Sequence, residues 1–489
     1  MRACLWLFLL GLCACQRREQ TALDRLHPCT LAEGPTDGYC GKLAVFEDRE
    51  ARRGRKIDLK IVVLPALSRD PKPDPIFFFQ GGPGAAAATL ASTEAPIFKR
   101  FQTDRDIVLV DQRGTGGSNS LACDYAEQID EDYENINNYP VDKVRACLEK
   151  LKQKADPALY TTPIAMDDID EVRRTLGYGQ INLWGISYGT RAALIYLKRH
   201  EDAVRAVVLD SVDAPEMKFP LYMARDGQRA LDRLLADCAK DAACEKEFPD
   251  LKRVVDELFA RLRAKPRVRI AHPMTGKVVE FPVGDQLVAG VVYATLYNPA
   301  AASLLPRLLW DATRGNYQGI LANGLGARPE PGSVSEGMFL SVICSEDFPR
   351  ISAEEVKRET GGRFFGTTMF DSRVKPCAFW PKGKITPDYY EPVRSSKPVL
   401  VLSGADDPIT PPSWGEQVAK ELKNAVHILA PGLGHGVSPH GCAPDLIGRL
   451  FDTASVAGLD GGCLNVQHRP PFFVNYTGPV VGAPAEKKP

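Results

Sequence analysis

The sequence places a serine between two glycines in the stretch GISYG, residues 185–189. The apolar run INLWGIS (181–187) leads up to this serine, Ser187, and a helical pattern, YGTRAALIYLKR, follows it. A G-x-S-x-G motif at a turn from strand to helix is typical of a nucleophilic serine, because Gly185 and Gly189 give the tight turn room. The same five-residue pattern also arises by chance in ordinary turns, so Ser187 needs partners before it counts as a nucleophile.

A serine hydroxyl is hardly ionised at neutral pH, so it requires a base and a carboxylate that orients the base. Asp407 lies in ADDPITPP after the apolar run VLVLSG, and His435 lies in GLGHGVSPHG after VHILAP. The order serine, acid, histidine, each after a strand, is that of hydrolases built on a parallel sheet. We therefore predict Ser187, Asp407 and His435 as a catalytic triad. The alternatives are Asp406 as the acid and His440 or His427 as the base, with His427 expected inside a strand.

An acyl-transfer enzyme also needs N–H donors for the oxyanion. The N–H of Tyr188 directly follows the nucleophile and is the first candidate. The second lies in QGGPG (80–84), a loop after the run PIFFF, and we assign it to Gly82 because Pro83 has no N–H. By itself GGPG is an ordinary turn, and its place after a strand favours the oxyanion role.

Apolar runs and helical patterns alternate along the chain, which predicts a mainly parallel α/β sheet. After about Pro215 this rhythm gives way to helical patterns, and strands return at 397–404. We therefore predict a largely helical cap domain at 216–390, inserted between core segments at 16–215 and 391–489. The predicted strands lie at 38–47, 57–65, 75–82, 105–114, 181–187, 204–212, 397–404 and 425–432, and a helix is predicted at 162–177.

The first fifteen residues, MRACLWLFLLGLCAC, are typical of a secretory signal, with Arg2 before a short apolar core. Their end, LCAC, resembles a bacterial lipobox and predicts lipidation of Cys15; a plain cleaved signal is the alternative. With Gln16 next, we expect an outer-membrane or periplasmic location in the cell envelope, and membrane contact only through the anchor. The net charge of −1 and the lack of a long basic run exclude nucleic acid as an expected partner.

Ten of the 13 cysteines follow this leader, and an even number in an exported chain predicts disulfides. No C-x₂-C pair follows the leader and the histidines are scattered, so we predict no metal and no cofactor. Neighbouring couples suggest sequential pairing without fixing it: Cys29/Cys40, Cys123/Cys147, Cys238/Cys244, Cys344/Cys377 and Cys442/Cys463.

The motifs GGPG, DQRGTGGS, GISYG, DPITP and GHG occur in this order in the chain. From about residue 27 to 470, including a C-terminal cysteine-containing segment, the chain resembles the prolyl-iminopeptidase and tripeptidyl-aminopeptidase family of α/β-hydrolase serine exopeptidases. The resemblance implies an α/β-hydrolase fold, the triad given above, and support of the acid loop by Thr410. Family members often carry HGGPG where this chain has Gln80, and we expect modest consequences.

An exopeptidase must hold a free α-amine, which calls for a carboxylate near the cleft. The family resemblance points to Glu346 in the segment MFLSVICSEDFPR, with Asp347 second. The alternative is an acidic helix end beside a disulfide. Asp111 and Arg113 of DQRGTGGS are expected to brace loops beside the site rather than to do chemistry.

The sequence therefore predicts an exported serine exopeptidase, without a cofactor, acting on peptides with a free N-terminus. A carboxylic-ester hydrolase with the same triad is the alternative, and such an enzyme would have no use for Glu346. A non-catalytic binding protein of the envelope is a third hypothesis, which the ordered Ser, Asp and His disfavour. The number of residues removed and the oligomeric state stay open at this point.

Overall fold

The computed structural model describes residues 25–31, 37–93, 95–123, 140–326 and 333–479. In these residues the largest sheet has nine strands in the order β1-β2-β3-β5-β4-β6-β7-β10-β11. The pairs from β1 to β5 are antiparallel and those from β5 to β11 are parallel, which confirms the predicted mainly parallel sheet. The strands are β1 His27–Thr30, β2 Asp37–Phe46, β3 Lys56–Leu64, β4 Ile76–Phe79, β5 Ile107–Val110, β6 Ile181–Ile186, β7 Val204–Asp210, β10 Val399–Gly404 and β11 Ala425–Ala430.

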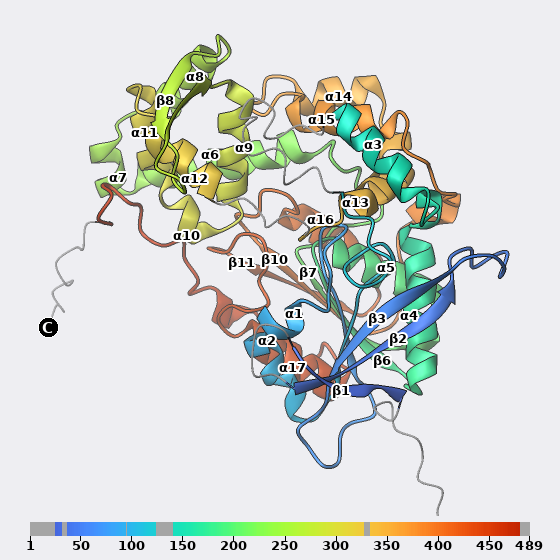
Figure 1. Cartoon of the computed structure of the whole chain (residues 1–489). Coiled ribbons are helices and arrows are strands. Elements are labelled where there is room, and N and C mark those ends of the chain that lie inside the picture. The colour runs from blue at the N-terminus through green and yellow to red at the C-terminus, as the bar shows by residue number, and fades with distance from the viewer. Residues whose placement is uncertain (1–24, 32–36, 94, 124–139, 327–332, 480–489) are drawn as a thin grey trace, which may run out of the picture.

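The central strands are apolar on both faces. β4 (IFFF) and β5 (IVLV) are buried at every position, as expected of parallel strands covered on both sides. Helices α4, α5 and α16 contribute to the apolar core on one face, and α1, α2 and α17 lie on the other (Figure 1). These helices are α1 Leu90–Thr93, α2 Ala95–Lys99, α4 Thr162–Leu176, α5 Tyr188–Arg199, α16 Pro412–Glu421 and α17 Ala443–Thr453.

Helix α4 shows how local sequence sets these elements. Pro163 occupies its first turn, where a missing N–H costs nothing, and Gly177 ends it with a left-handed φ of 83°. Ile169, Val172 and Leu176 recur at helical spacing and are buried against the sheet core. Within the described ranges no helix is both long and apolar enough to cross a membrane.

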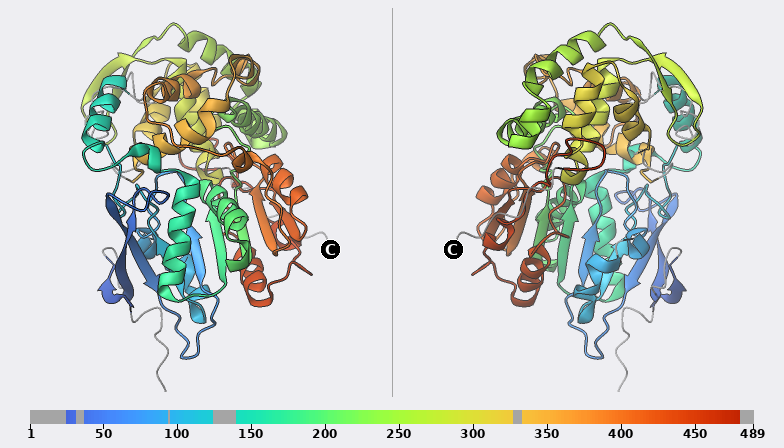
Figure 2. Two further views of the ribbon diagram at one scale, coloured as in Figure 1. Left: turned by 90° about the vertical axis from the view of Figure 1, so that its right-hand side faces the viewer. Right: turned by 90° about the vertical axis from the view of Figure 1, so that its left-hand side faces the viewer.

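Between β7 and β10 the chain leaves the sheet for residues 211–398, which we call the insertion. Figures 1 and 2 show its helices grouped at one end of the sheet. Its first half, through α12, has an apolar core of its own, whereas residues 338–344 of its second half belong to the core of the sheet. The 216–390 boundaries stay a prediction. The helices are α6 Met223–Lys240, α7 Ala242–Glu247, α8 Leu251–Leu262, α9 Asp285–Leu296, α10 Pro299–Ala302, α11 Leu305–Thr313, α12 Gln318–Gly326, α13 Glu336–Val342, α14 Ala353–Thr360 and α15 Thr368–Cys377.

The insertion also contains a β-hairpin that the helical patterns did not predict. It consists of β8 (Arg267–Ala271) and β9 (Val278–Pro282), paired antiparallel. The signal in the sequence is the alternation RVRIA, in which Val268 and Ile270 are buried and the residues between them are exposed. Gly276, at a φ of 68°, lies in the turn.

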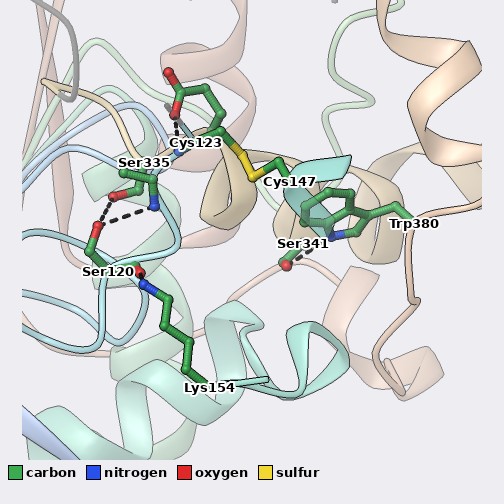
Figure 3. Close-up of a disulfide and its surroundings, with 9 residues drawn as sticks. Ser120, Cys123, Cys147, Lys154, Ser335, Ser341 and Trp380 are labelled. Carbon is green, nitrogen blue, oxygen red and sulfur yellow. Dashed lines mark hydrogen bonds between the residues drawn. A yellow bond between two sulfur atoms is a disulfide. The ribbon is translucent and has the colours of Figure 1, made fainter. Parts of the chain in front are cut away.

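The ten cysteines after the leader are joined in sequential pairs, which resolves the open pairing. The Cys123–Cys147 disulfide links the loop after β5 to α3 (Val141–Leu151) where both meet the insertion (Figure 3). There the N–H of Cys123 donates to Glu336 at 3.0 Å, and Ser120 and Ser335 share a hydrogen bond of 3.0 Å. The other pairs are Cys29–Cys40, Cys238–Cys244, Cys344–Cys377 and Cys442–Cys463.

Candidate active site

Ser187 lies at a strained turn between β6 and α5. Its φ of 57° and ψ of −129° are values that a residue with a side chain rarely adopts. A Cβ on Gly185 would approach the carbonyl oxygen of Gly189 to 2.2 Å, and one on Gly189 would approach that of Phe79 to 1.9 Å. Both glycines are therefore required by close backbone contacts, and the turn that they permit holds Ser187 at the carboxyl end of β6.

Asp407 and His435 form a hydrogen-bonded pair. Oδ2 of Asp407 lies 2.8 Å from Nδ1 of His435, and Oδ1 accepts from the N–H groups of Ile409 and Thr410, each at 2.9 Å. The Thr410 hydroxyl lies 2.8 Å from the same Oδ2 and 3.2 Å from Nδ1 of His435. This is the support of the acid loop that the resemblance implied for Thr410.

The charges of this pair stabilise each other. Burial opposes ionisation of Asp407, yet His435 and the hydrogen bonds around the carboxylate hold its pKa below the usual value. Burial likewise disfavours the imidazolium, while Asp407 raises the pKa of His435 above its usual value. An imidazole held in this way, with Nδ1 on the carboxylate, leaves Nε2 to accept a proton.

The sheet brings these residues to one edge. Ser187 follows β6, Asp407 follows β10 and His435 follows β11, and these strands run parallel. The strand between them, β7, ends at Asp210, whose carbonyl accepts from the N–H of Ser187 at 3.0 Å. The insertion reaches the same edge, because the carbonyl of Tyr297 accepts from the N–H of His435 at 3.1 Å.

The carboxylate of Asp210 holds the loop that carries His435. It is fully buried and accepts from the N–H groups of Val437 and Ser438, at 2.9 and 2.7 Å, and from the Ser438 hydroxyl at 2.5 Å. Beside it, the Ser211 hydroxyl accepts from the N–H of Gly436 at 2.8 Å. Sequence reasoning did not single out Asp210. The signal in the sequence is an acidic residue at the end of an apolar strand, β7, which pairs with the strand that Ser187 follows.

The alternative triad residues have other partners. Asp406 pairs with Arg233 at 3.0 Å and with Arg469 at 2.7 Å. His427 lies inside β11 with its Nε2 2.9 Å from the Ser403 hydroxyl, as expected of a structural histidine. His440 is exposed in the turn before α17.

The loop after β4 places two glycines against Ser187. A Cβ on Gly81 would lie 3.0 Å from that of Ser187, so a side chain at this position would crowd the nucleophile. The N–H of Gly81 donates to the Gln80 side chain at 2.9 Å, which leaves Gly82 as the donor to consider for the oxyanion. Gly82 and Tyr188 line one pocket with Ser187.

Asp213 and Asp347 line one side of that pocket, which we call the acidic wall, and Arg191 lines the pocket beside them. Arg191 donates to both oxygens of Asp347, at 3.0 and 3.1 Å, and to Asp213 at 2.8 Å. Glu346 also pairs with Arg191, at 3.6 Å. Sequence reasoning did not single out Asp213, whose signal was its place in LDSVDAP just past the end of β7.

Glu346 lies behind this wall and is not among the pocket residues. It is fully buried, and its two oxygens accept from the N–H and hydroxyl of Thr162, at 2.7 and 2.9 Å, and from the hydroxyl of Tyr389. Between the two candidates, the geometry therefore favours Asp347 for direct contact with a ligand. Burial raises the pKa of Asp347 to about 7, against the opposing effect of Arg191.

Asp111 and Arg113 brace loops as expected. Asp111 accepts from the N–H groups of Ala88 and Gly117, at 2.8 and 2.9 Å. Arg113 forms a bidentate pair with Asp168 at 2.6 and 3.0 Å. The described residues contain no group of His, Cys, Asp and Glu placed to hold a metal ion. Cys15, the predicted lipidation site, lies outside the described residues.

Two family models match the chain. One, described as alpha/beta hydrolase fold, matches residues 74–247, and the other, described as TAP-like protein, matches residues 362–463. Serine protease Hip1 of Mycobacterium tuberculosis is 26% identical over 430 residues, which cover 80% of this chain and 80% of that protein. Tripeptidyl aminopeptidase of Streptomyces coelicolor is 23% identical over 464 residues, covering 88% and 83%. Carboxylesterase B of M. tuberculosis is 26% identical over 426 residues, covering 78% of each.

The fold and these matches define an α/β hydrolase. More closely, the chain belongs to the TAP-like α/β-hydrolase family and is a serine hydrolase.

Proposed function

We propose that this protein is an exported serine aminopeptidase that cleaves peptides near a free N-terminus. The observation that carries the proposal is the acidic wall, Asp213 and Asp347, in the same pocket as Ser187. An ammonium group is the cation that every unblocked peptide brings to such a wall. Similarity to a tripeptidyl aminopeptidase and a serine protease supports the same class of reaction.

The charges of the buried cluster favour a cation as ligand. Asp213, Glu346 and Asp347 share two guanidiniums, of Arg191 and Arg350, and burial raises the pKa of all three carboxyls. Because charges are costly to bury unless they are neutralised, one further positive charge in the pocket is stabilising. The α-amine of a peptide supplies that charge.

In the proposed reaction, Ser187 Oγ attacks the carbonyl carbon of the scissile bond while His435 Nε2 takes the hydroxyl proton. Asp407 holds Nδ1 and stabilises the imidazolium, and the N–H groups of Gly82 and Tyr188 hold the oxyanion. His435 then gives its proton to the leaving amine, and the acyl group stays bound to Ser187 Oγ as an acyl-enzyme. A water molecule, deprotonated by His435, attacks the ester carbonyl; the bond to Ser187 Oγ breaks, His435 returns the proton to Oγ, and the acyl group leaves as the carboxylic acid.

Hydrolysis of paired chromogenic anilides, with a free or an acetylated amine, tests this function. Wild type is expected to prefer the free amine by about 100-fold, because acetylation removes the cation. The variant Ser187→Ala is expected to cut neither. Equal cleavage of acetylated peptides contradicts amine recognition, and loss of the Ser187 requirement contradicts the triad.

A carboxylic-ester hydrolase is the second candidate, since Carboxylesterase B is a relative of comparable identity. Under this alternative, simple esters are cut through Ser187 and peptides are not. Substituting Asp347 then leaves the substrate preference unchanged.

The proposal includes export to the cell envelope. It is supported by the leader-like residues 1–15 and by five disulfides, which persist in oxidising compartments. Membrane fractionation of wild type and Cys15→Ser tests the anchor. The variant is expected to move from the membrane to the soluble fraction, and an unchanged distribution contradicts lipidation of Cys15.

A further inference from the structure

We propose that Arg229, on α6 of the insertion, is a positioning residue of the triad, whose guanidinium holds the backbone of Asp407 so that the carboxylate meets His435. Arg229 is not among the residues that line the pocket with Ser187, so it acts through Asp407 rather than on the substrate. This inference rests on the triad of the proposed function and is independent of the kind of substrate.

A single guanidinium holds the acid loop at two carbonyls. Nη1 of Arg229 donates to the carbonyl of Ala405 at 2.9 Å, and Nη2 donates to that of Asp407 at 2.6 Å. A guanidinium is planar and its N–H groups form a rigid fork, so the two carbonyl oxygens are held at a fixed spacing. Because one of them belongs to Asp407 itself, a displacement of Arg229 moves the residue whose carboxylate lies 2.8 Å from His435 Nδ1.

The partners of Arg229 make it a poor contributor to stability. This half-buried side chain donates to carbonyls instead of carboxylates, and its Nε has no acceptor among the described residues. Burial lowers the pKa of the guanidinium, against the opposing charges of Asp226, Asp407 and Asp406. A buried cation with an unsatisfied donor costs free energy, so the arrangement is better explained by the geometry that it imposes on the acid loop.

Arg233, about one turn further along α6, shows the ordinary arrangement of an arginine. It pairs with the carboxylate of Asp406 at 3.0 Å, and the other oxygen of Asp406 accepts from Arg469 at 2.7 Å. Consecutive aspartates of one loop thus meet consecutive turns of one helix. Arg233 neutralises a carboxylate outside the triad, whereas Arg229 holds the main chain of the triad's acid.

The same half of the insertion supports the base as well as the acid. The carbonyl of Tyr297, just after α9, accepts from the N–H of His435, and the two rings pack edge-on with centroids 5.1 Å apart. Ile409, whose N–H donates to Asp407 Oδ1, belongs to the apolar core of the insertion rather than to that of the sheet. The geometry of the triad therefore depends on the insertion, and Arg229 is a charged contact between them.

The guanidinium also places a positive charge near the Asp407–His435 pair. This charge stabilises the carboxylate of Asp407 and repels the imidazolium of His435. The carboxylates that favour the imidazolium stay in place when Arg229 is replaced: Asp407, Asp210 and Asp213. Removing the positive charge should therefore raise the pKa of His435 and move the acid limb of kcat/KM to higher pH, which a residue that only stabilised the fold would not do.

The test measures steady-state kinetics with 4-nitrophenyl acetate, an activated ester that needs the triad but carries no amine. We expect Arg229→Gln to lower kcat about 30-fold with KM within about threefold of wild type, because the acid is displaced and no binding contact is lost. Its acid limb should move up by about half a pH unit. Arg229→Lys keeps the charge without the fork, so it should keep the wild-type limb and still lose kcat about tenfold.

Arg233→Gln is the matched control, since it removes an arginine from the same helix and the same loop and should keep kcat within about threefold of wild type. The inference is overturned if a folded Arg229→Gln keeps its kcat, shows an unmoved acid limb, or loses no more kcat than Arg233→Gln does. It is equally overturned if KM rises while kcat is retained. Should Arg229→Gln not fold, Arg229→Lys decides, and wild-type kcat in that variant overturns the inference.

The same ester separates this inference from the proposed function. Ester cleavage that persists in Ser187→Ala overturns the triad and, with it, the role of Arg229. If wild type cuts the ester through Ser187 but does not cut free-amine anilides, the aminopeptidase function is wrong, and the kinetics of the Arg229 variants still decide the inference.

Discussion

Two groups of buried carboxylates flank Ser187, and they differ in what surrounds their charges. Asp210 and Asp407, at the ends of β7 and β10, accept from backbone N–H groups and hydroxyls, and Asp407 also pairs with His435. Asp213 and Asp347 face the guanidinium of Arg191 instead. The first group is saturated by the protein itself, whereas the second, together with Glu346, shares two guanidiniums among three carboxyls.

This difference in partners predicts a different role for each group of carboxylates. Backbone N–H donors have fixed positions, so a carboxylate that collects several of them fixes a loop rather than binding a ligand. Buried carboxyls that outnumber the arginines beside them are ionised more readily when a ligand cation binds next to them. We therefore expect changes in the first group to lower kcat, and changes in the second to raise KM for substrates with a free amine.

Asp407→Asn is expected to have the largest effect, a loss of about 10⁴-fold in kcat with little change in KM, because His435 loses the carboxylate that sets its tautomer. Steady-state kinetics on a free-amine anilide measures it. The matched control is Asp406→Asn, which alters the neighbouring aspartate that pairs with Arg233 and Arg469. If the control loses as much kcat as Asp407→Asn does, the acid is wrongly assigned.

Asp210→Asn is expected to lower kcat about 100-fold, since its amide would turn a donor toward the N–H groups of Val437 and Ser438 and displace the His435 loop. Removing this charge also lowers the pKa of His435, which Asp210 helps to raise. The acid limb of kcat/KM for a simple ester therefore moves to lower pH.

A merely structural role for Asp210 would lower the rate without moving that limb. Ser438→Ala provides the control, because it removes one hydroxyl from Asp210 and keeps the charge. It is expected to keep the wild-type limb, and a limb shifted equally in both variants would contradict the electrostatic part of the prediction.

These two groups also differ in how far the sequence reveals them. Ser187, Asp407 and His435 each follow an apolar run that became a strand, and such local patterns predicted the sheet and placed all three residues at one edge. Asp210 and Asp347 act through partners 227 and 156 residues away, Val437 and Arg191. No local pattern encodes those contacts.

The choice between adjacent Glu346 and Asp347 illustrates the same limit of local patterns. Both lie in a single π-helical turn, Ile343–Asp347, and which side chain faces the pocket depends on Thr162 and Tyr389. The resemblance placed Glu346 first, and the packing of distant residues places Asp347 on the pocket wall.

Asp347→Asn is expected to raise KM for free-amine anilides about 10- to 100-fold with a smaller change in kcat, because it removes a charge that holds the amine. The dependence of wild-type kcat/KM on pH should show the ionisation of Asp347. With a pKa of about 7, Asp347 becomes protonated as pH falls, so kcat/KM for the anilide drops below about pH 7.

A simple ester does not use the amine, so its acid limb reports His435 alone and provides the reference. In Asp347→Asn the anilide and ester profiles should coincide on the acid side. If they already coincide in wild type, Asp347 does not bind the amine.

The smallest expected effect is on stability. Burial raises the pKa of Asp347 from 3.8 to about 7. Between about pH 4 and pH 7 the folded protein therefore binds more protons than the unfolded chain. The contribution of Asp347 to the free energy of unfolding falls as pH rises through that window. Asp347→Asn removes that dependence. Its Tm relative to wild type should rise by a few degrees from pH 5 to pH 8.

Asp74→Asn provides the contrast, since it breaks pairs with Arg105 at 3.0 Å and Arg205 at 3.2 Å and should lower Tm at both pH values. A site that loses stability as its carboxyl ionises, yet needs that charge for affinity toward free amines, is one in which the charge acts on the ligand rather than on the fold. If Asp347→Asn instead lowers Tm equally at pH 5 and pH 8, as Asp74→Asn does, Asp347 belongs with the carboxylates that stabilise the fold.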